Sequence, residues 1–231
     1  MLLFHVLRAG HEDVVRVLLA AGARPNECSG DTASPLWLAL SWRRAPSLVR
    51  LLLEAGANPN LTFGSGAPKI GEDKRITMLG MAVQNDDVAC VRLLVAAGAD
   101  LEAESGSWRR CWRPLGAAAS AGRFSIVVAL LAAGARPDST SGEFHSCVLQ
   151  GALERCHAPV VALLLVAGAW VHGAVRGMSN ANDRSMLVCV LNAIRVRASR
   201  TTGWQTTART LVGMLLASGL SVSDEPRFRR N

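Results

Sequence analysis

The sequence predicts an all-α solenoid built from short helix pairs that recur along the chain. Two observations carry this prediction: a recurring glycine at the end of aliphatic runs, and a recurring helix-start signal upstream of it. The glycines are Gly22, Gly56, Gly98, Gly134, Gly168 and Gly219. Successive glycines lie 34, 42, 36, 34 and 51 residues apart, and the shorter intervals are typical of two-helix repeats. The longer intervals indicate insertions in loops.

The aliphatic run before each glycine predicts the second helix of a repeat. In the first repeat the run contains Val14, Val15, Val17 and Leu18, and this spacing gives a helix one apolar face. The glycine follows the last turn, because a residue without Cβ readily adopts the left-handed conformation that ends a helix. Each run is therefore expected to form one short, half-buried helix.

The first helix of each repeat is predicted from a signal about 19 residues before the glycine. Ser34-Pro35-Leu36 combines a capping serine with proline at the first helical position, and Thr77-Met78-Leu79 has a similar cap. A small residue follows three positions after the leucine and lets neighbouring first helices approach closely. These residues are Ala39, Ala82, Ala118 and Ala152.

These motifs resemble those of a known family. Residues 34–39, Ser-Pro-Leu-Trp-Leu-Ala, resemble the Thr-Pro-Leu-His-x-Ala motif of ankyrin repeats, and residues 9–26 resemble the rest of that repeat. The resemblance extends over nearly the whole chain. It implies an ankyrin-repeat solenoid of about six repeats, at residues 1–26, 32–60, 75–102, 111–138, 145–172 and 183–223, before a short basic tail at 224–231.

The resemblance is imperfect in three repeats. The second repeat has Ala45-Pro46 where the first has the inter-helix turn Gly10-His11, and the fifth has Cys156-His157 there. The sixth repeat carries about 13 extra residues between its helices, around Arg195 to Trp204. We therefore expect the sixth repeat to depart most from the pattern.

Composition restricts where the protein acts. The longest apolar run, from Val160 to Val171, has about 12 residues, whereas a membrane-spanning helix needs about 20, so no membrane insertion is expected. The first residues lack the pattern of a signal peptide. The six cysteines show no Cys-x-x-Cys pair, which favours reduced thiols in an intracellular protein, cytoplasmic or nuclear.

The apolar face of the N-terminal helix is expected to be covered by another protein surface. The helix starts with Met1-Leu2-Leu3-Phe4, although the end repeats of a solenoid usually present a polar outer face. Self-association and further repeats upstream are the two ways in which this face would be covered.

No segment carries the pattern of a metal, cofactor or catalytic site. His145, Cys147, Cys156 and His157 offer zinc ligands, but a helix of about 13 Å separates the two cysteines at 1.5 Å per residue, so the four cannot converge. The glycine-rich segment 64–71 lacks the Gly-Lys-Ser/Thr of a phosphate-binding loop. We therefore expect no enzyme activity, no metal and no cofactor.

The segment 108–113, Trp-Arg-Arg-Cys-Trp-Arg, is the strongest candidate binding site. Tryptophan and arginine are enriched at the energetic centres of protein interfaces, and Arg109, Arg110 and Trp112 lie in the loop before the fourth repeat. Ankyrin-like loops of this kind form fingers beside a concave face. The alternative is that the tryptophans pack on an adjacent finger and the arginines are only solvated.

Similar residue types recur at equivalent places of other repeats and would line up in a solenoid. The remaining candidates are Trp42, Arg43, Phe144, Arg155 and Arg184. We predict that this strip binds another protein as a scaffold or adaptor, and the net charge of +7 favours an acidic partner surface. Nucleic-acid binding is the alternative, although acidic residues dispersed among the arginines disfavour it.

Overall fold

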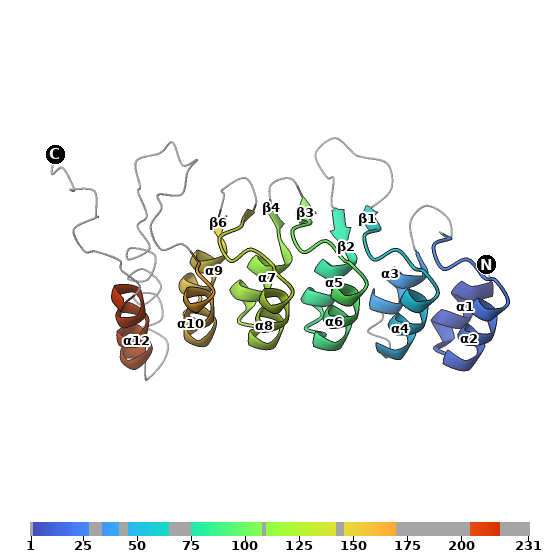
Figure 1. Cartoon of the computed structure of the whole chain (residues 1–231), viewed down its shortest axis with the longest axis horizontal. Coiled ribbons are helices and arrows are strands. Elements are labelled where there is room, and N and C mark those ends of the chain that lie inside the picture. Colours follow the sequence, from blue (N-terminus) through green and yellow to red (C-terminus); the bar gives the residue numbers. More distant parts are fainter. Residues whose placement is uncertain are drawn as a thin grey trace. The chain divides into compact units, whose positions relative to one another are not determined.

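The computed structural model describes residues 2–27, 34–41, 46–64, 75–107, 110–141, 146–169 and 204–217. The chain forms two compact units. The first unit contains Met1–Pro114 together with Ala132–Gly134, and the second contains Leu115–Leu131 and Ala135–Asn231. Figure 1 shows that helices dominate both units and that short strands extend from one end of the helix pairs.

Three helix pairs make up the first unit. Their bounds are α1 Leu2–Ala9, α2 Glu12–Ala20, α3 Pro35–Ser41, α4 Pro46–Glu54, α5 Met78–Gln84 and α6 Val88–Ala96. The first helices contact one another in the order α1, α3, α5, and the second helices in the order α2, α4, α6. Val15, Val49 and Val91 occupy equivalent positions in the second helices and are fully buried. This stacking of helix pairs is the predicted all-α repeat fold.

Side-chain caps and prolines start these helices where the sequence predicts them. The Oγ of Ser34 accepts a hydrogen bond from the backbone N of Trp37 at 3.2 Å, and the Oγ1 of Thr77 accepts one from Gly80 N at 2.9 Å. Pro35 and Pro46 are the first residues of α3 and α4, where a missing N–H leaves no helical bond unmade. The predicted small residues Ala39 and Ala82 are buried.

Glycine ends the second helices in the left-handed conformation. At Gly56 the backbone φ is +87°, and the next residue, Ala57, donates its N–H to Leu52 O at 2.9 Å. The inter-helix turns need the same conformation, which Gly10 and Gly122 adopt. Asp86 and Cys156 hold it at φ of 60° and 56° despite their side chains. A side chain in this region costs about 1–2 kcal/mol.

The first repeat differs from the prediction in one respect. The aliphatic run of α2 is not buried throughout, because Val14 is 44% exposed and Val17 is 66% exposed. The positions equivalent to Val14 in the next two repeats, Leu48 and Cys90, are buried. Periodicity identified the helix correctly but overestimated how much of its apolar surface the fold covers.

The loops between repeats form antiparallel fingers. Strands β1 (Thr62–Gly64), β2 (Arg75–Thr77), β3 (Ser105–Ser107) and β4 (Arg110–Trp112) join in this order into one four-stranded sheet, which we call the finger sheet. The pair Arg75–Gly106 links the two hairpins. In the second unit, β5 (Thr140–Ser141) pairs with β6 (Ser146–Cys147).

Asparagine side chains connect successive repeats in the first unit, forming what we call the amide ladder. Asn26 donates its Nδ2 to Gly56 O at 2.9 Å and accepts from Asn58 N at 2.7 Å. Asn60 repeats both contacts one repeat later, to Gly98 O at 3.0 Å and from Asp100 N at 2.8 Å. The next equivalent residue is Glu102, a carboxylate that cannot donate when ionised.

The second unit contains five described helices, α7 (Pro114–Ala121), α8 (Phe124–Ala132), α9 (Val148–Glu154), α10 (Ala158–Val166) and α12 (Trp204–Ala217). Gly151 of α9 lies close to α7, since a Cβ there would meet Ser120 Cβ at 3.3 Å. α10 contacts α12, in which Leu211 and Leu215 are buried. The first helix predicted for the sixth repeat, its insertion and the basic tail lie outside the described residues.

Candidate partner-binding surface

The structure describes three of the eight predicted site residues, at least in part. The backbone of Arg110 lies in β4. Trp112 is the last residue of that strand and is half-buried, and Arg155 is exposed in the turn after α9. Outside the described residues lie Trp42, Arg43, Arg109, Phe144 and Arg184. The proposed strip can therefore be analysed at the finger sheet of the first unit, and at Arg155 in the second.

Trp112 lies in a well-anchored part of the finger sheet. Its backbone pairs with that of Ser105, and the buried Ser105 Oγ lies 2.7 Å from Thr77 Oγ1. Ser105 Oγ also accepts a hydrogen bond from Thr77 N at 3.1 Å. A Cβ at Gly80 would clash with Ser105 Oγ and approach Thr77 Oγ1 to 2.8 Å. The finger is thus fixed to the start of α5 by a contact that only glycine at position 80 permits.

Arg113, directly after Trp112, forms ion pairs with two glutamates, and no sequence motif predicted this cluster. Its Nη1 lies 3.1 Å from Glu102 Oε2, and its Nε lies 3.5 Å from Glu104 Oε1. The first contact is also a hydrogen bond, whereas the Nε is near enough for ion pairing but makes no hydrogen bond in the described structure. The Arg113 side chain is only 23% exposed, so these carboxylates hold it in place.

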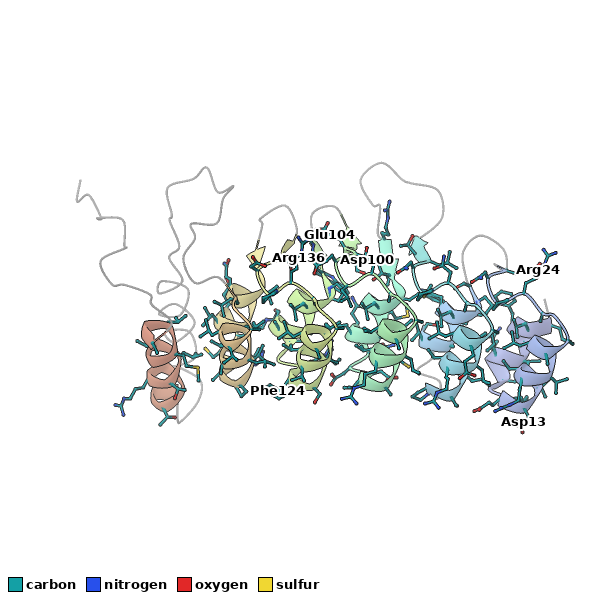
Figure 2. All side chains as sticks on the ribbon, in the orientation of Figure 1. Asp13, Arg24, Asp100, Glu104, Phe124 and Arg136 are labelled. Carbon is teal, nitrogen blue, oxygen red and sulfur yellow. The ribbon has the colours of Figure 1, made fainter. Side chains whose placement is uncertain are left out.

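The described surface carries charges of both signs. The first unit has eight arginines against nine aspartates and glutamates among its described residues. Figure 2 shows Asp100 and Glu104 on the finger side of this unit. In the second unit, the exposed Arg155 directly follows the exposed Glu154. Arginines and carboxylates are therefore present in similar numbers among the described residues of the first unit.

Two polar residues at the ends of the first helices have structural roles. Asn85 donates its Nδ2 to Leu40 O at 2.8 Å, which connects the end of α5 to the end of α3. Ser41 bonds back to Leu38 O within its own helix at 3.2 Å. Gln84 is exposed at the same end of α5. Of these three, Gln84 presents most of its surface to a partner.

The described residues offer little for covalent or metal chemistry. No three His, Cys, Asp or Glu side chains among them come close enough together to hold a metal ion. Burial, with a smaller contribution from the hydrogen bond to Asp87, raises the pKa of the Cys90 thiol from its ordinary 9.0 to about 12. This thiol stays protonated at neutral pH, and a protonated thiol is a poor nucleophile. His157 Nε2 lies 3.1 Å from Ser120 O and joins two repeats.

The length and hydropathy of the described helices bear on membrane insertion. No helix in this part of the chain is both long and apolar enough to cross a bilayer.

Helix pairs closed by left-handed glycines and joined by antiparallel fingers define a class of repeat protein. The ankyrin repeat family matches residues 31–62, which contain α3, α4 and the start of the first finger hairpin. The other described helix pairs repeat the same glycine register. The chain therefore contains an ankyrin repeat at residues 31–62, and its fold is that of ankyrin-repeat proteins. No curated protein matches it. Ankyrin repeats generally serve as protein-protein interaction modules, and the family is typically non-catalytic.

Proposed function

We propose that this protein is a non-catalytic scaffold or adaptor that binds a partner protein through the finger sheet and the exposed ends of its first helices. The finger at Trp112 supports this proposal most directly. A half-exposed tryptophan on a strand that Ser105 and Thr77 anchor needs little ordering when it binds, and interfaces gain affinity from such preorganisation. Arginine and tryptophan are also the side chains that most often dominate interface energies.

The charge pattern favours a protein partner over nucleic acid. Glu102 and Glu104 flank Arg113 and would repel a phosphate backbone, whereas a protein surface can match alternating charges one by one. The partner surface that fits best is acidic opposite Arg109 and Arg110 and polar opposite Glu104.

A partner identified by affinity capture and then purified allows a direct test. The variant Arg109→Ala/Arg110→Ala/Trp112→Ala should weaken its binding by at least about 2 kcal/mol, because truncated hot-spot residues typically cost this much. The control replaces exposed residues on the helices of the second unit, Phe124→Ala/Arg209→Ala/Val166→Ala, and should bind normally.

Two results would count against the proposal. Normal binding by the finger variant would place the site elsewhere on the molecule. Tight binding of a single-stranded oligonucleotide, lost in the same variant and weakened by salt, would support the nucleic-acid alternative.

A further inference from the structure

A row of exposed arginines crosses the second helices of the first unit. Each arginine lies six residues before the glycine that ends its repeat, so the three occupy the same position in α2, α4 and α6. They are Arg16, Arg50 and Arg92, and all three are exposed. We call them the arginine row. It lies on different helices from those that carry the finger sheet and was not among the predicted site residues.

The spacing of the row follows from helix packing. α2 contacts α4, and α4 contacts α6, and packed helices are separated by about 8–10 Å. Equivalent positions of stacked repeats therefore present three guanidinium groups at about this interval. An α-helix that lies across the row presents residues i and i+7 on one face about 10.5 Å apart, at 1.5 Å per residue. Heptad spacing thus matches the row.

An apolar row runs beside the arginines. The residue that follows each of them is aliphatic and incompletely buried: Val17 is 66% exposed, and Leu51 and Leu93 are half-buried. One turn further along, α2 and α6 have the small residues Ala20 and Ala96, whereas α4 has the exposed Glu54. A partner helix could therefore place apolar side chains against this row while its carboxylates meet the arginines.

Neighbouring acids limit the width of the positive surface. Glu12 Oε1 lies 3.4 Å from Arg16 Nη2, and Glu12 Oε2 accepts a hydrogen bond from Ser47 Oγ at 2.6 Å. Asp13 is exposed at the start of α2, where Figure 2 shows it on the side away from the fingers, and Glu54 is exposed at the end of α4. A broad polyanion would meet all of these carboxylates, and a narrow acidic stripe competes only with Glu12 for the guanidinium of Arg16.

We propose that the arginine row and the adjacent apolar row bind an amphipathic helix of a partner protein, with acidic residues at every seventh position beside an apolar stripe. This surface is separate from the finger sheet, so the protein would have two binding faces in its first unit. Charge complementarity sets the register along the row, and the apolar contacts supply area. Exposed ion pairs are individually weak, so recognition depends on all three arginines acting together.

A designed peptide tests this directly. The probe is a labelled 21-residue helix with glutamate at every seventh position, leucine on the adjacent stripe and alanine or glutamine elsewhere. We expect the full chain to bind it at low salt, and Arg16→Gln/Arg50→Gln/Arg92→Gln to bind it at least tenfold more weakly in fluorescence anisotropy. The control variant Arg24→Gln/Arg136→Gln/Arg209→Gln removes the same charge from exposed sites elsewhere and should bind as the unchanged chain does.

A second peptide of equal charge, with its glutamates five residues apart, separates register from simple attraction and should bind at least fivefold more weakly than the heptad probe. Equal binding of the two peptides would overturn the proposal, as would unchanged affinity in the row variant or no binding at all. A single-stranded oligonucleotide that competes fully through the same arginines would also overturn it. Circular dichroism of both variants checks that each remains folded.

Discussion

The outer faces of the second helices differ between the two units, although their buried faces are alike. In the first unit the position six residues before the turn glycine holds Arg16, Arg50 or Arg92, whereas in the second it holds Val128 or Ala162. The position one residue earlier is a fully buried valine in all five repeats, at Val15, Val49, Val91, Val127 and Val161. The buried residues maintain the fold, and the exposed ones are free to acquire a function.

The helices α8 and α10 of the second unit are correspondingly apolar on their exposed faces. Phe124 and Val166 are 45% and 87% exposed, and Val128 is also exposed. α10 contains no polar side chain along its length, and α8 contains only Ser125. The same helix-pair core therefore supports a charged outer face in one unit and an apolar outer face in the other.

The largest effect is expected in the buried positions that the units share. Leu130→Ala in α8 and Leu52→Ala in α4 each truncate a fully buried leucine and should lower the free energy of unfolding by about 2–5 kcal/mol. Val128→Ser and Arg50→Ser, on the exposed faces, should change it by less than about 0.5 kcal/mol. Urea unfolding followed by circular dichroism measures all four. A costly Val128→Ser would show that this face is covered in solution.

Backbone conformation should give a smaller effect, similar in both units. Gly56→Ala and Gly168→Ala introduce a Cβ at φ of +87° and +84°, with no other atom nearby. Each should therefore cost about 1–2 kcal/mol through the left-handed backbone alone. Gly213→Ala is the matched control, because Gly213 lies within α12 with equally open space. It should stabilise the protein by up to about 1 kcal/mol, and an unchanged stability would show that α12 is not a stable helix.

The amide ladder should contribute about 1 kcal/mol per hydrogen bond. Asn60→Asp keeps the acceptor for Asp100 N but removes the donor to Gly98 O, so we expect a drop of about this size in unfolding free energy. Asn60→Ala removes both contacts and should cost more. If the two variants have equal stability, the bond to Asp100 N contributes nothing and the ladder is weaker than its geometry suggests.

The smallest effect on stability is expected from the exposed apolar residues of the second unit. Phe124→Ser/Val166→Ser should leave the thermal midpoint almost unchanged, because both side chains retain wide access to solvent. Binding of a hydrophobic dye to the native protein should fall, since fewer apolar side chains would be exposed. Unchanged dye binding would locate the exposed apolar surface elsewhere, for example at Leu2 and Val17 of the first repeat.

The helix pairs could be predicted from the sequence because their signals are local. The capping hydroxyl of Thr77, the helical spacing around Val91 and the left-handed Gly98 each depend on a few neighbouring residues. Their recurrence in register also distinguishes them from chance. The burial of Ala39 and Ala82 followed from the same register.

The candidate site was less predictable because its contacts join distant segments. The finger sheet depends on Arg75 meeting Gly106, and the cluster at Arg113 depends on two loop carboxylates that no local pattern singles out. The exposure of Val17 depends on what lies beside α2, which its own periodicity does not encode. The arginine row could have been found by aligning the repeats on their glycines and comparing exposed positions.

The contact between Gly80 and Ser105 limits the order in which mutations can accumulate. A side chain at position 80 would occupy the space of the Ser105 hydroxyl, so this hydroxyl must first be lost or moved, which breaks its bonds to Thr77. An evolving lineage would have to pass through a loosened finger before it could gain a better helix former in α5. Two positions 25 residues apart in the sequence are therefore inherited as a pair.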